Sequence, residues 1–226
     1  LFLFSLCFFL GSNPIASQQL PSGATFRAGD AKINYHNSSL YIRQSTPRAV
    51  IDWQSFNVGR GGAVHFIQPD HSSAILNRVV EPGASQIHGQ ITATGQVFIT
   101  NSNGIYFGKS ASVDVGSMVA SSFEVGKEDF MKGDLKFRSE YGKEGKISNA
   151  GEIKAQANGF VALLAPEVRN QGVIFAKKGS VVLASGEMVE LQTNPSQRLI
   201  GIRVEKGKWD TLVENSKVIE ADNGMV

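Results

Sequence analysis

The chain has 226 residues, a formal net charge of +2, 24 glycines and a single cysteine. This length suffices for one large all-β or α/β domain with a continuous core, and the high glycine content predicts many tight turns and few helices. The near-neutral charge, without a block of Lys and Arg, argues against a nucleic-acid partner, which would require a basic patch.

The first ten residues, LFLFSLCFFL, form an uncharged apolar run, followed by helix breakers at 11–14 and small residues at Ala16 and Ser17. This order is typical of a secretory signal peptide, and the run is shorter than the about 20 apolar residues that span a bilayer. We expect a signal peptide at 1–17 that lacks its charged start, followed by an exported domain at 18–226. The alternative is a buried strand or helix of the fold.

Cys7 lies within the expected leader, so the exported part would contain no cysteine and could form no disulfide. Secreted domains of this size often carry disulfides. Their absence is consistent with a chain that must stay unfolded while it passes through a second, narrow pore, and also with chance.

Beyond the leader, apolar residues alternate with other residues at a period of two, which predicts short, half-buried strands. The alternating pairs are Val64/Phe66, Ile87/Ile91, Val97/Ile99, Ile105/Phe107, Val113/Val115, Ile147/Ile153, Val161/Leu163, Val173/Phe175, Val181/Leu183 and Val189/Leu191. The one helix that we expect is a short segment at 127–131.

The punctuation of these strands repeats about every 20 residues. The segment NAGEI at 149–153 matches NQGVI at 170–174, and GFVAL at 159–163 matches GSVVL at 179–183. Upstream, Gly89 precedes Gly151 by 62 residues, which we interpret as three periods. Three strands of four or five residues with three turns would close one coil at the ~4.8 Å strand spacing, so the repeat predicts a right-handed parallel β-helix in which Asn149 and Asn170 stack.

Two other all-β folds are alternatives to the β-helix. An up-and-down barrel or sandwich has short alternating strands but requires no fixed 20-residue repeat. A leucine-rich repeat has a similar period, but its LxxLxLxxN signature is missing. We further expect an N-terminal cap at 20–33 and two excursions from the coil, at 58–62 and at the charged, solvated stretch 124–146.

Eight short motifs follow one another from about residue 20 onward: LPSG (20–23), IDWQSFNVG (51–59), VHFIQP (64–69), ILNRV (75–79), IHG (87–89), GQVFI (95–99), NSNGIYFG (101–108) and LLAPEVRNQGVI (163–174). Together they resemble the two-partner-secretion domain at the N-terminus of filamentous-haemagglutinin-type exoproteins. The resemblance implies a β-helical secretion module at the start of a longer exoprotein. It also implies a partner, the periplasmic domains of a dedicated outer-membrane transporter, and delivery through the periplasm to the cell surface or medium.

The resemblance assigns a secretion turn to Asn101, Ser102, Asn103, Gly104 and Ile105. The family pattern there is Asn-Pro-Asn-Gly-Ile, and Ser102 replaces the proline, so we expect a turn that forms with less rigidity. A second family motif, Asn-Pro-Asn-Leu, has no recognisable copy. Further residues of the matching motifs are assigned to transporter recognition: Asp52, Trp53, Phe56, Asn77 and Arg78.

Motifs for chemistry are weak, and we expect no enzyme activity, metal or cofactor. Lys109 and Ser110 follow a glycine as in a phosphate-binding loop, but Asn103 stands where the first glycine is required. His36, His65, His71 and His88 are too scattered for a metal site and are interpreted as turn or surface residues.

Two rival functions stay open. The first is a polysaccharide-degrading β-helix enzyme, which would require paired carboxylates on one face. Residues 21 apart share a face of the coil, and Glu152 is followed at that spacing by Val173. The second is an adhesin that binds a host glycan or protein through aromatics such as Trp53 and Trp209, although Trp53 lies in a core-like pattern. We expect host contact to belong to the missing downstream region.

Overall fold

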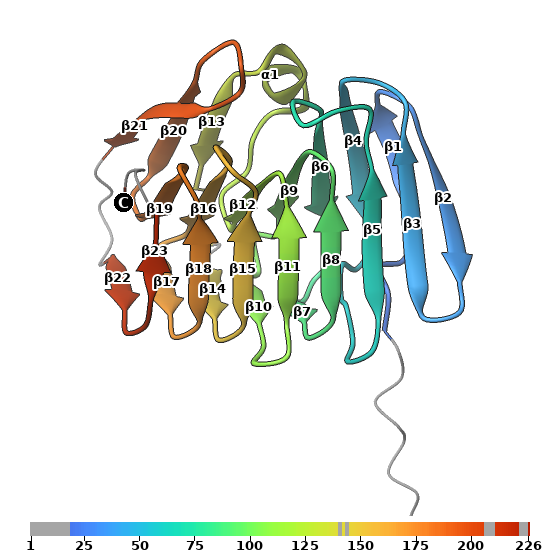
Figure 1. The fold of residues 1–226 in the computed structure, drawn as a ribbon, viewed down its shortest axis with the longest axis horizontal. Helices are drawn as coiled ribbons and strands as arrows, with labels where there is room; N and C mark the ends of the chain where they lie inside the picture. Colours follow the sequence, from blue (N-terminus) through green and yellow to red (C-terminus); the bar gives the residue numbers. More distant parts are fainter. Residues whose placement is uncertain (1–18, 140–141, 143–144, 206–210, 222–225) are drawn as a thin grey trace, which may run out of the picture.

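The computed structural model of the protein describes residues 19–139, 142, 145–205, 211–221 and 226. The expected leader at 1–17 lies outside these residues, as does Trp209. Within them the chain winds into a stack of coils in which each coil adds one strand to each of three parallel sheets (Figure 1).

The front sheet of Figure 1 consists, in spatial order, of β2 (Ala31–His36), β3 (Ser39–Gln44), β5 (Ala63–Ile67), β8 (Gln90–Ala93), β11 (Ser112–Val115), β15 (Glu152–Ala155), β18 (Val173–Ala176) and β23 (Ile219–Glu220). The second sheet consists of β1 (Thr25–Ala28), β4 (Arg48–Trp53), β6 (Ala74–Val79), β9 (Gln96–Thr100), β12 (Ser117–Ser121), β16 (Phe160–Leu164) and β19 (Ser180–Ala184). The third sheet consists of β7 (Ser85–Ile87), β10 (Ile105–Phe107), β14 (Lys146–Asn149), β17 (Glu167–Asn170) and β22 (Leu212–Asn215).

Outside the coils, an antiparallel outer sheet consists of β13 (Leu135–Arg138), β20 (Met188–Thr193) and β21 (Leu199–Glu205). The helix α1 (Lys127–Lys132) lies beside it (Figure 1). The expected β-helix with extra-helical strands is therefore confirmed, as is the short helix. In the described part of the chain, no helix is long and apolar enough to cross a membrane.

The N-terminal cap closes the first coil with antiparallel pairs. Strand β1 pairs with β4, and β2 pairs with β3, whereas the later neighbours in both sheets are parallel. Capping in this way occupies backbone groups that an open sheet edge would leave unpaired. The cap extends to His36, slightly beyond the expected 20–33.

The register confirms the repeat near the C-terminal end. Asn149 is aligned with Asn170, and Val161 with Val181, which are offsets of 21 and 20 residues. The interpretation of the Gly89–Gly151 spacing as three periods is wrong. Gln90 is aligned with Ser112 and Ser112 with Glu152, so only two coils separate the glycines. The second of these coils is long because it contains α1 and β13.

Two hydrophobic clusters hold the domain together. The first fills the interior of the coils and includes Val97, Ile99, Val161 and Leu163, which confirms their inward orientation. The second lies between the outer face of the second sheet and the elements outside the coils. Strands of the second sheet such as β9, β12 and β16 are therefore buried along their whole length, as is typical when both faces of a sheet are covered.

The charged stretch 124–146 is an excursion from the coil, as expected, but the expectation that it is solvated throughout is wrong. Its apolar residues Phe130, Leu135 and Phe137 are buried in the second cluster. The Phe130 ring packs edge-on against Phe98 of β9 at a centroid distance of 5.1 Å. Charged residues of its described part, such as Glu128, Asp129 and Lys136, are exposed, so this segment is an amphipathic cover for the second sheet.

The stretch 58–62 is a corner of a coil, so the expectation that it leaves the coil is wrong. Val58 is fully buried and forms a parallel bridge with Ile87 of the third sheet. The Gly62 amide donates to the Gly59 carbonyl and closes the corner. A Cβ on Gly89 would lie 2.2 Å from the Gly62 carbonyl oxygen, so glycine allows adjacent corners to stack closely.

Candidate functional site

The turn assigned to secretion follows directly after β9, and Asn101 organises it. The Gly104 amide donates to the Asn101 carbonyl at 2.8 Å, while the Asn103 amide donates to Asn101 Oδ1 at 2.9 Å. Asn101 Nδ2 donates to the Gly83 carbonyl and to Ser85 Oγ of the preceding coil. Asn101 is fully buried. The same side chain therefore shapes the turn and ties two coils together.

Both the backbone conformation and the close surroundings of position 104 require a glycine. Its φ is 103°, a value that residues with a Cβ rarely adopt. A Cβ built at this position would lie 2.6 Å from the Lys146 carbonyl oxygen of the next coil. Ser102, in the place of the family's proline, is nearly buried within a closed turn. The turn forms without proline; its expected lower rigidity stays a prediction.

Three of the residues assigned to transporter recognition lie inside the domain. Trp53 Nε1 donates to Asn77 Oδ1 at 3.0 Å, and Asn77 Nδ2 donates to the Phe98 carbonyl at 3.1 Å. The Phe56 ring packs edge-on against Trp53 at 5.7 Å. The side chains of Trp53, Phe56 and Asn77 are fully buried. In the folded domain none of them presents a surface to a partner, and Trp53 is not an exposed aromatic.

Asp52 connects the cap to the coils through two ion pairs. One carboxylate oxygen accepts from Arg27 Nε of β1 at 2.6 Å, and the other accepts from Arg78 Nε of β6 at 2.7 Å. The Asp52 side chain is only 5% exposed, while those of Arg27 and Arg78 are 49% and 23% exposed. A nearly buried carboxylate with two charge-assisted bonds holds its neighbours more firmly than a surface pair would.

Arg78 and the secretion turn face the same hollow, of about 370 Å³. Its lining includes Arg78, Glu81, Ser102, Asn103 and Glu124. The structure thus places the turn beside one of the residues assigned to transporter recognition, although Arg78 and Ser102 are 24 positions apart in the sequence. Sequence reasoning missed Glu81 and Glu124, because no motif links them to the turn.

The remaining sequence motifs have structural roles. Asn149 Nδ2 donates to Asn170 Oδ1 at 2.8 Å, and Asn170 Nδ2 donates to Asn215 Oδ1 at 2.7 Å, so the expected asparagine stack spans three coils. Ser110 of the phosphate-loop-like motif donates to the His88 carbonyl. In the described part of the chain, no three His, Cys, Asp or Glu side chains gather as a metal site would require.

A comparison with protein families matches residues 17–225 to the TPS secretion domain. The chain belongs to the TPS secretion domain family. It is therefore a secretion domain, which directs an exoprotein to export through a partner transporter. This agrees with the resemblance carried by the eight motifs, among them those at 51–59 and 101–108.

Individual relatives agree with this family. The chain is 32% identical over 227 residues to a heme/hemopexin-binding protein of Haemophilus influenzae, covering 97% of this chain and 25% of that protein. The crystal structure of the HMW1 secretion domain from Haemophilus influenzae superposes with a TM-score of 0.85 at 29% identity, covering 90% of this chain and 54% of the other. The chain thus spans about a quarter of the curated relative and resembles a solved TPS secretion domain over most of its length.

Proposed function

We propose that the transporter recognises this TPS secretion domain in the periplasm, while its N-terminal coils are still unfolded. The observation that carries the proposal is the complete burial of Trp53, Phe56 and Asn77. If these residues contribute to recognition, a partner can contact them only in an extended chain. The rival possibility is recognition of the folded surface around Arg78 and the secretion turn.

An extended chain offers its partner a specific means of binding. Unpaired strands can add to an exposed sheet edge, where backbone hydrogen bonds provide affinity and alternating side chains provide specificity. The exported segment has many short strands and no cysteine, so no disulfide would hold it closed before export. Both features suit a segment that is read before it folds.

We also propose that the domain, once outside the cell, starts the folding of the rest of a longer exoprotein. The last strands β19, β22 and β23 end their sheets, and Leu212 and Val213 on β22 are 40% and 46% exposed. Each coil of a repeat protein is stabilised mainly by its neighbours, so a formed stack is a template for further coils. Host contact and haem or hemopexin binding would belong to the remainder of such a protein, and this domain would act by binding and not by catalysis.

A pair of disulfide locks tests the recognition proposal. Ala49 is aligned with Ile75, and Val161 with Val181, on adjacent strands whose spacing of about 4.8 Å lies within the range that a disulfide bridges. The A49C/I75C lock closes the N-terminal coils, whereas the V161C/V181C lock closes only late coils and serves as the matched control. Each variant is oxidised while folded and then presented to the periplasmic fragment of the transporter.

We expect the oxidised N-terminal lock to lose binding and to regain it on reduction, because the extended segment is then released. The control lock should bind whether oxidised or reduced, provided that the N-terminal coils can open separately. Unchanged affinity of the oxidised A49C/I75C variant would refute recognition of an extended chain and would favour the folded surface.

A further inference from the structure

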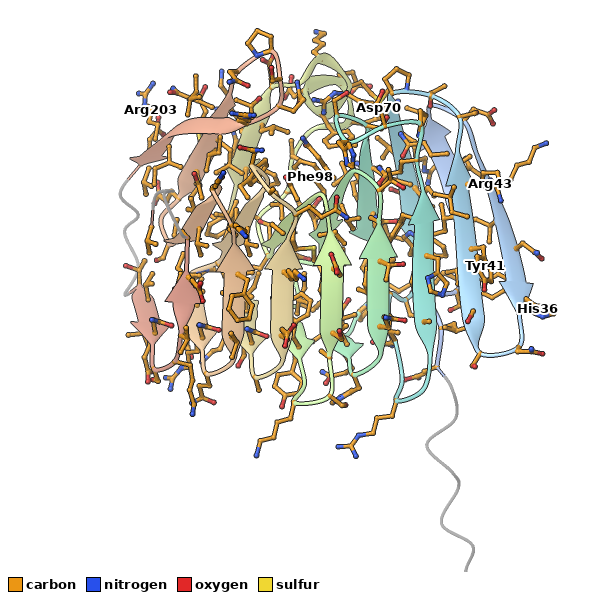
Figure 2. All side chains as sticks on the ribbon, viewed as in Figure 1. His36, Tyr41, Arg43, Asp70, Phe98 and Arg203 are labelled. Carbon is orange, nitrogen blue, oxygen red and sulfur yellow. The ribbon has the colours of Figure 1, made fainter. Side chains whose placement is uncertain are left out.

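The outer face of the front sheet carries a row of aligned polar and aromatic side chains. Tyr41, His65, Thr92, Asp114 and Lys154 are in register on the successive strands β3, β5, β8, β11 and β15. Neighbouring strands are about 4.8 Å apart, so the row presents one side chain per coil at this interval. Figure 2 shows Tyr41 and Arg43 along β3 and Asp70 in the loop above the neighbouring strand.

Four residues of this row, Tyr41, His65, Thr92 and Asp114, form the floor of a trough. A shallow hollow of about 560 Å³ is lined by Tyr41, His65, His71, Thr92 and Asp114, among others. A second hollow, of about 660 Å³, lies under the turn between β20 and β21. His71 and Gln156 line both hollows, so the two adjoin each other. The trough therefore follows the axis of the β-helix over several coils.

The aromatic end of the trough is held in place. The Tyr41 and His65 rings stack at a centroid distance of 4.9 Å, and His65 Nδ1 is hydrogen-bonded to Thr92 Oγ1 at 2.8 Å. His71 Nδ1 donates to the Thr94 carbonyl at 3.0 Å. The loop that carries His71 is shaped by Asp70, whose carboxylate accepts hydrogen bonds from Ser72 and Ser73. These bonds, that of the Ser72 hydroxyl first, lower the pKa of Asp70.

Gln96, one of the residues that line the second hollow, has a hydrogen-bond acceptor without a donor. Gln96 is only 2% exposed, and its Oε1 has no hydrogen-bond partner among the described residues. Its Nε2 donates weakly, at 3.4 Å, to the Gln197 carbonyl of the β20–β21 turn. A buried amide oxygen without a hydrogen-bond partner is unfavourable.

We propose that this trough binds a neutral, linear oligosaccharide whose chain runs along the β-helix axis. A sugar ring has an apolar face that packs on an aromatic ring, and its hydroxyls both donate and accept hydrogen bonds. The edges of the stacked Tyr41 and His65 rings provide an apolar contact, while Thr92, Asp114 and Gln156 provide polar partners. The interval between coils is comparable with the length of one pyranose unit, so successive sugar residues can meet successive side chains.

Other ligand classes fit the trough less well. The first hollow is lined by one carboxylate and by no Lys or Arg, the second is lined by one cation, Arg198, and Lys154 at the end of the row is paired with Asp114, so the trough lacks the basic cluster that a sulfated or uronic-acid polymer would need. A peptide would add to a sheet edge, but the backbone groups in the middle of the front sheet are already paired with both neighbouring strands.

A binding assay on the folded domain tests the proposal separately from secretion. Isothermal titration is carried out with hexasaccharides of β-1,4-glucose, α-1,4-glucose, β-1,4-xylose and β-1,4-N-acetylglucosamine, and with heparin and polygalacturonate as acidic probes. The test variant is Tyr41→Ala. The matched control is Tyr106→Ala, which removes a similar tyrosine–histidine pair, Tyr106 and His88 at 5.6 Å, on the third sheet. Circular dichroism verifies that every variant is folded.

We expect at least one neutral hexasaccharide to bind with millimolar or better affinity. Comparison of the four neutral hexasaccharides then shows which sugar and linkage the trough prefers. Tyr41→Ala should weaken binding about tenfold, on the scale of one lost aromatic contact, and Tyr106→Ala should leave it unchanged. Absence of binding by every neutral probe at millimolar concentration would overturn the proposal. So would wild-type affinity in Tyr41→Ala, or tighter binding of heparin or polygalacturonate than of any neutral sugar.

Discussion

Trp53 of β4 and Asn77 of β6 are joined by a hydrogen bond of 3.0 Å between two fully buried side chains on adjacent coils. Asn77 also donates to the Phe98 carbonyl on the next strand, so this one amide connects three coils. Both residues belong to motifs that the sequence shares with secretion domains. Their first role in the folded protein is therefore to hold the early coils in register.

Replacing Asn77 by Ala should lower the free energy of unfolding by about 1–3 kcal/mol, because the Trp53 indole N–H and the Phe98 carbonyl both lose their partner in the interior. Urea denaturation followed by Trp fluorescence measures this change. Asn34→Ala, at an exposed position of β2, is the control and should change stability by less than about 0.5 kcal/mol. Equal stabilities of the two variants would contradict the role assigned to Asn77.

Replacing Asn170 by Ala should interrupt the asparagine stack at its centre. It removes the bonds to both Asn149 and Asn215, and it leaves the buried Asn149 amide without an acceptor. We expect a loss of about 1–3 kcal/mol. Hydrogen exchange should show faster opening of the coils around Asn149 than of the distant coil around Asn77. Protection around Asn149 equal to that in the unmodified protein would argue against the stack as a stabilising element.

Replacing Gly104 by Val should distort the secretion turn through both its positive φ and the contact with the Lys146 carbonyl. We expect reduced secretion with accumulation in the periplasm, measured by immunoblots of cell fractions. Gly61→Ala is the control, because Gly61 also has a positive φ, of 75°, an added Cβ meets nothing within 4 Å, and the residue lies in the corner at 58–62 and not in the secretion turn.

Comparison of folding and export in the Gly104 variant separates two roles of the turn. The hydrogen bonds of Asn101 show that the turn stabilises the fold, whereas a greater effect on export than on stability is our prediction. A Gly104→Val domain that refolds in vitro with little loss of stability but is poorly exported would support the specific role. Normal secretion would exclude it.

Replacing Val161 by Asp should prevent folding outside the cell. Val161 is fully buried in the interior of the coils, and a carboxylate there has no partner, so it is costly even after it takes up a proton. Protease resistance of the secreted protein measures the outcome. Ser112→Asp, at an exposed position of β11, should remain resistant. Wild-type amounts of protease-resistant Val161→Asp protein would contradict the inward orientation in solution.

The alternation of apolar residues and the 20-residue repeat were sufficient to predict the β-helix, the Asn149–Asn170 stack and the inward face of strands such as β16. These properties depend on neighbours in sequence or on a constant offset, because a strand alternates at every second residue and a coil returns to the same face after a constant length. The same regularity made the Gly89–Gly151 spacing misleading, since an inserted helix and strand can add nearly the length of a coil.

By itself the sequence determined the fold class and, through its motifs, the secretion family. Only the tertiary structure decided what covers the second sheet, that Trp53, Phe56 and Asn77 lie inside, and that Arg78 lies beside the secretion turn. Residues such as Val50, Phe98 and Phe160 look like an outward face in strand periodicity, yet they are buried because α1, β13, β20 and β21 pack over them. Such burial depends on contacts between segments distant along the chain, and no local pattern in a single sequence records them.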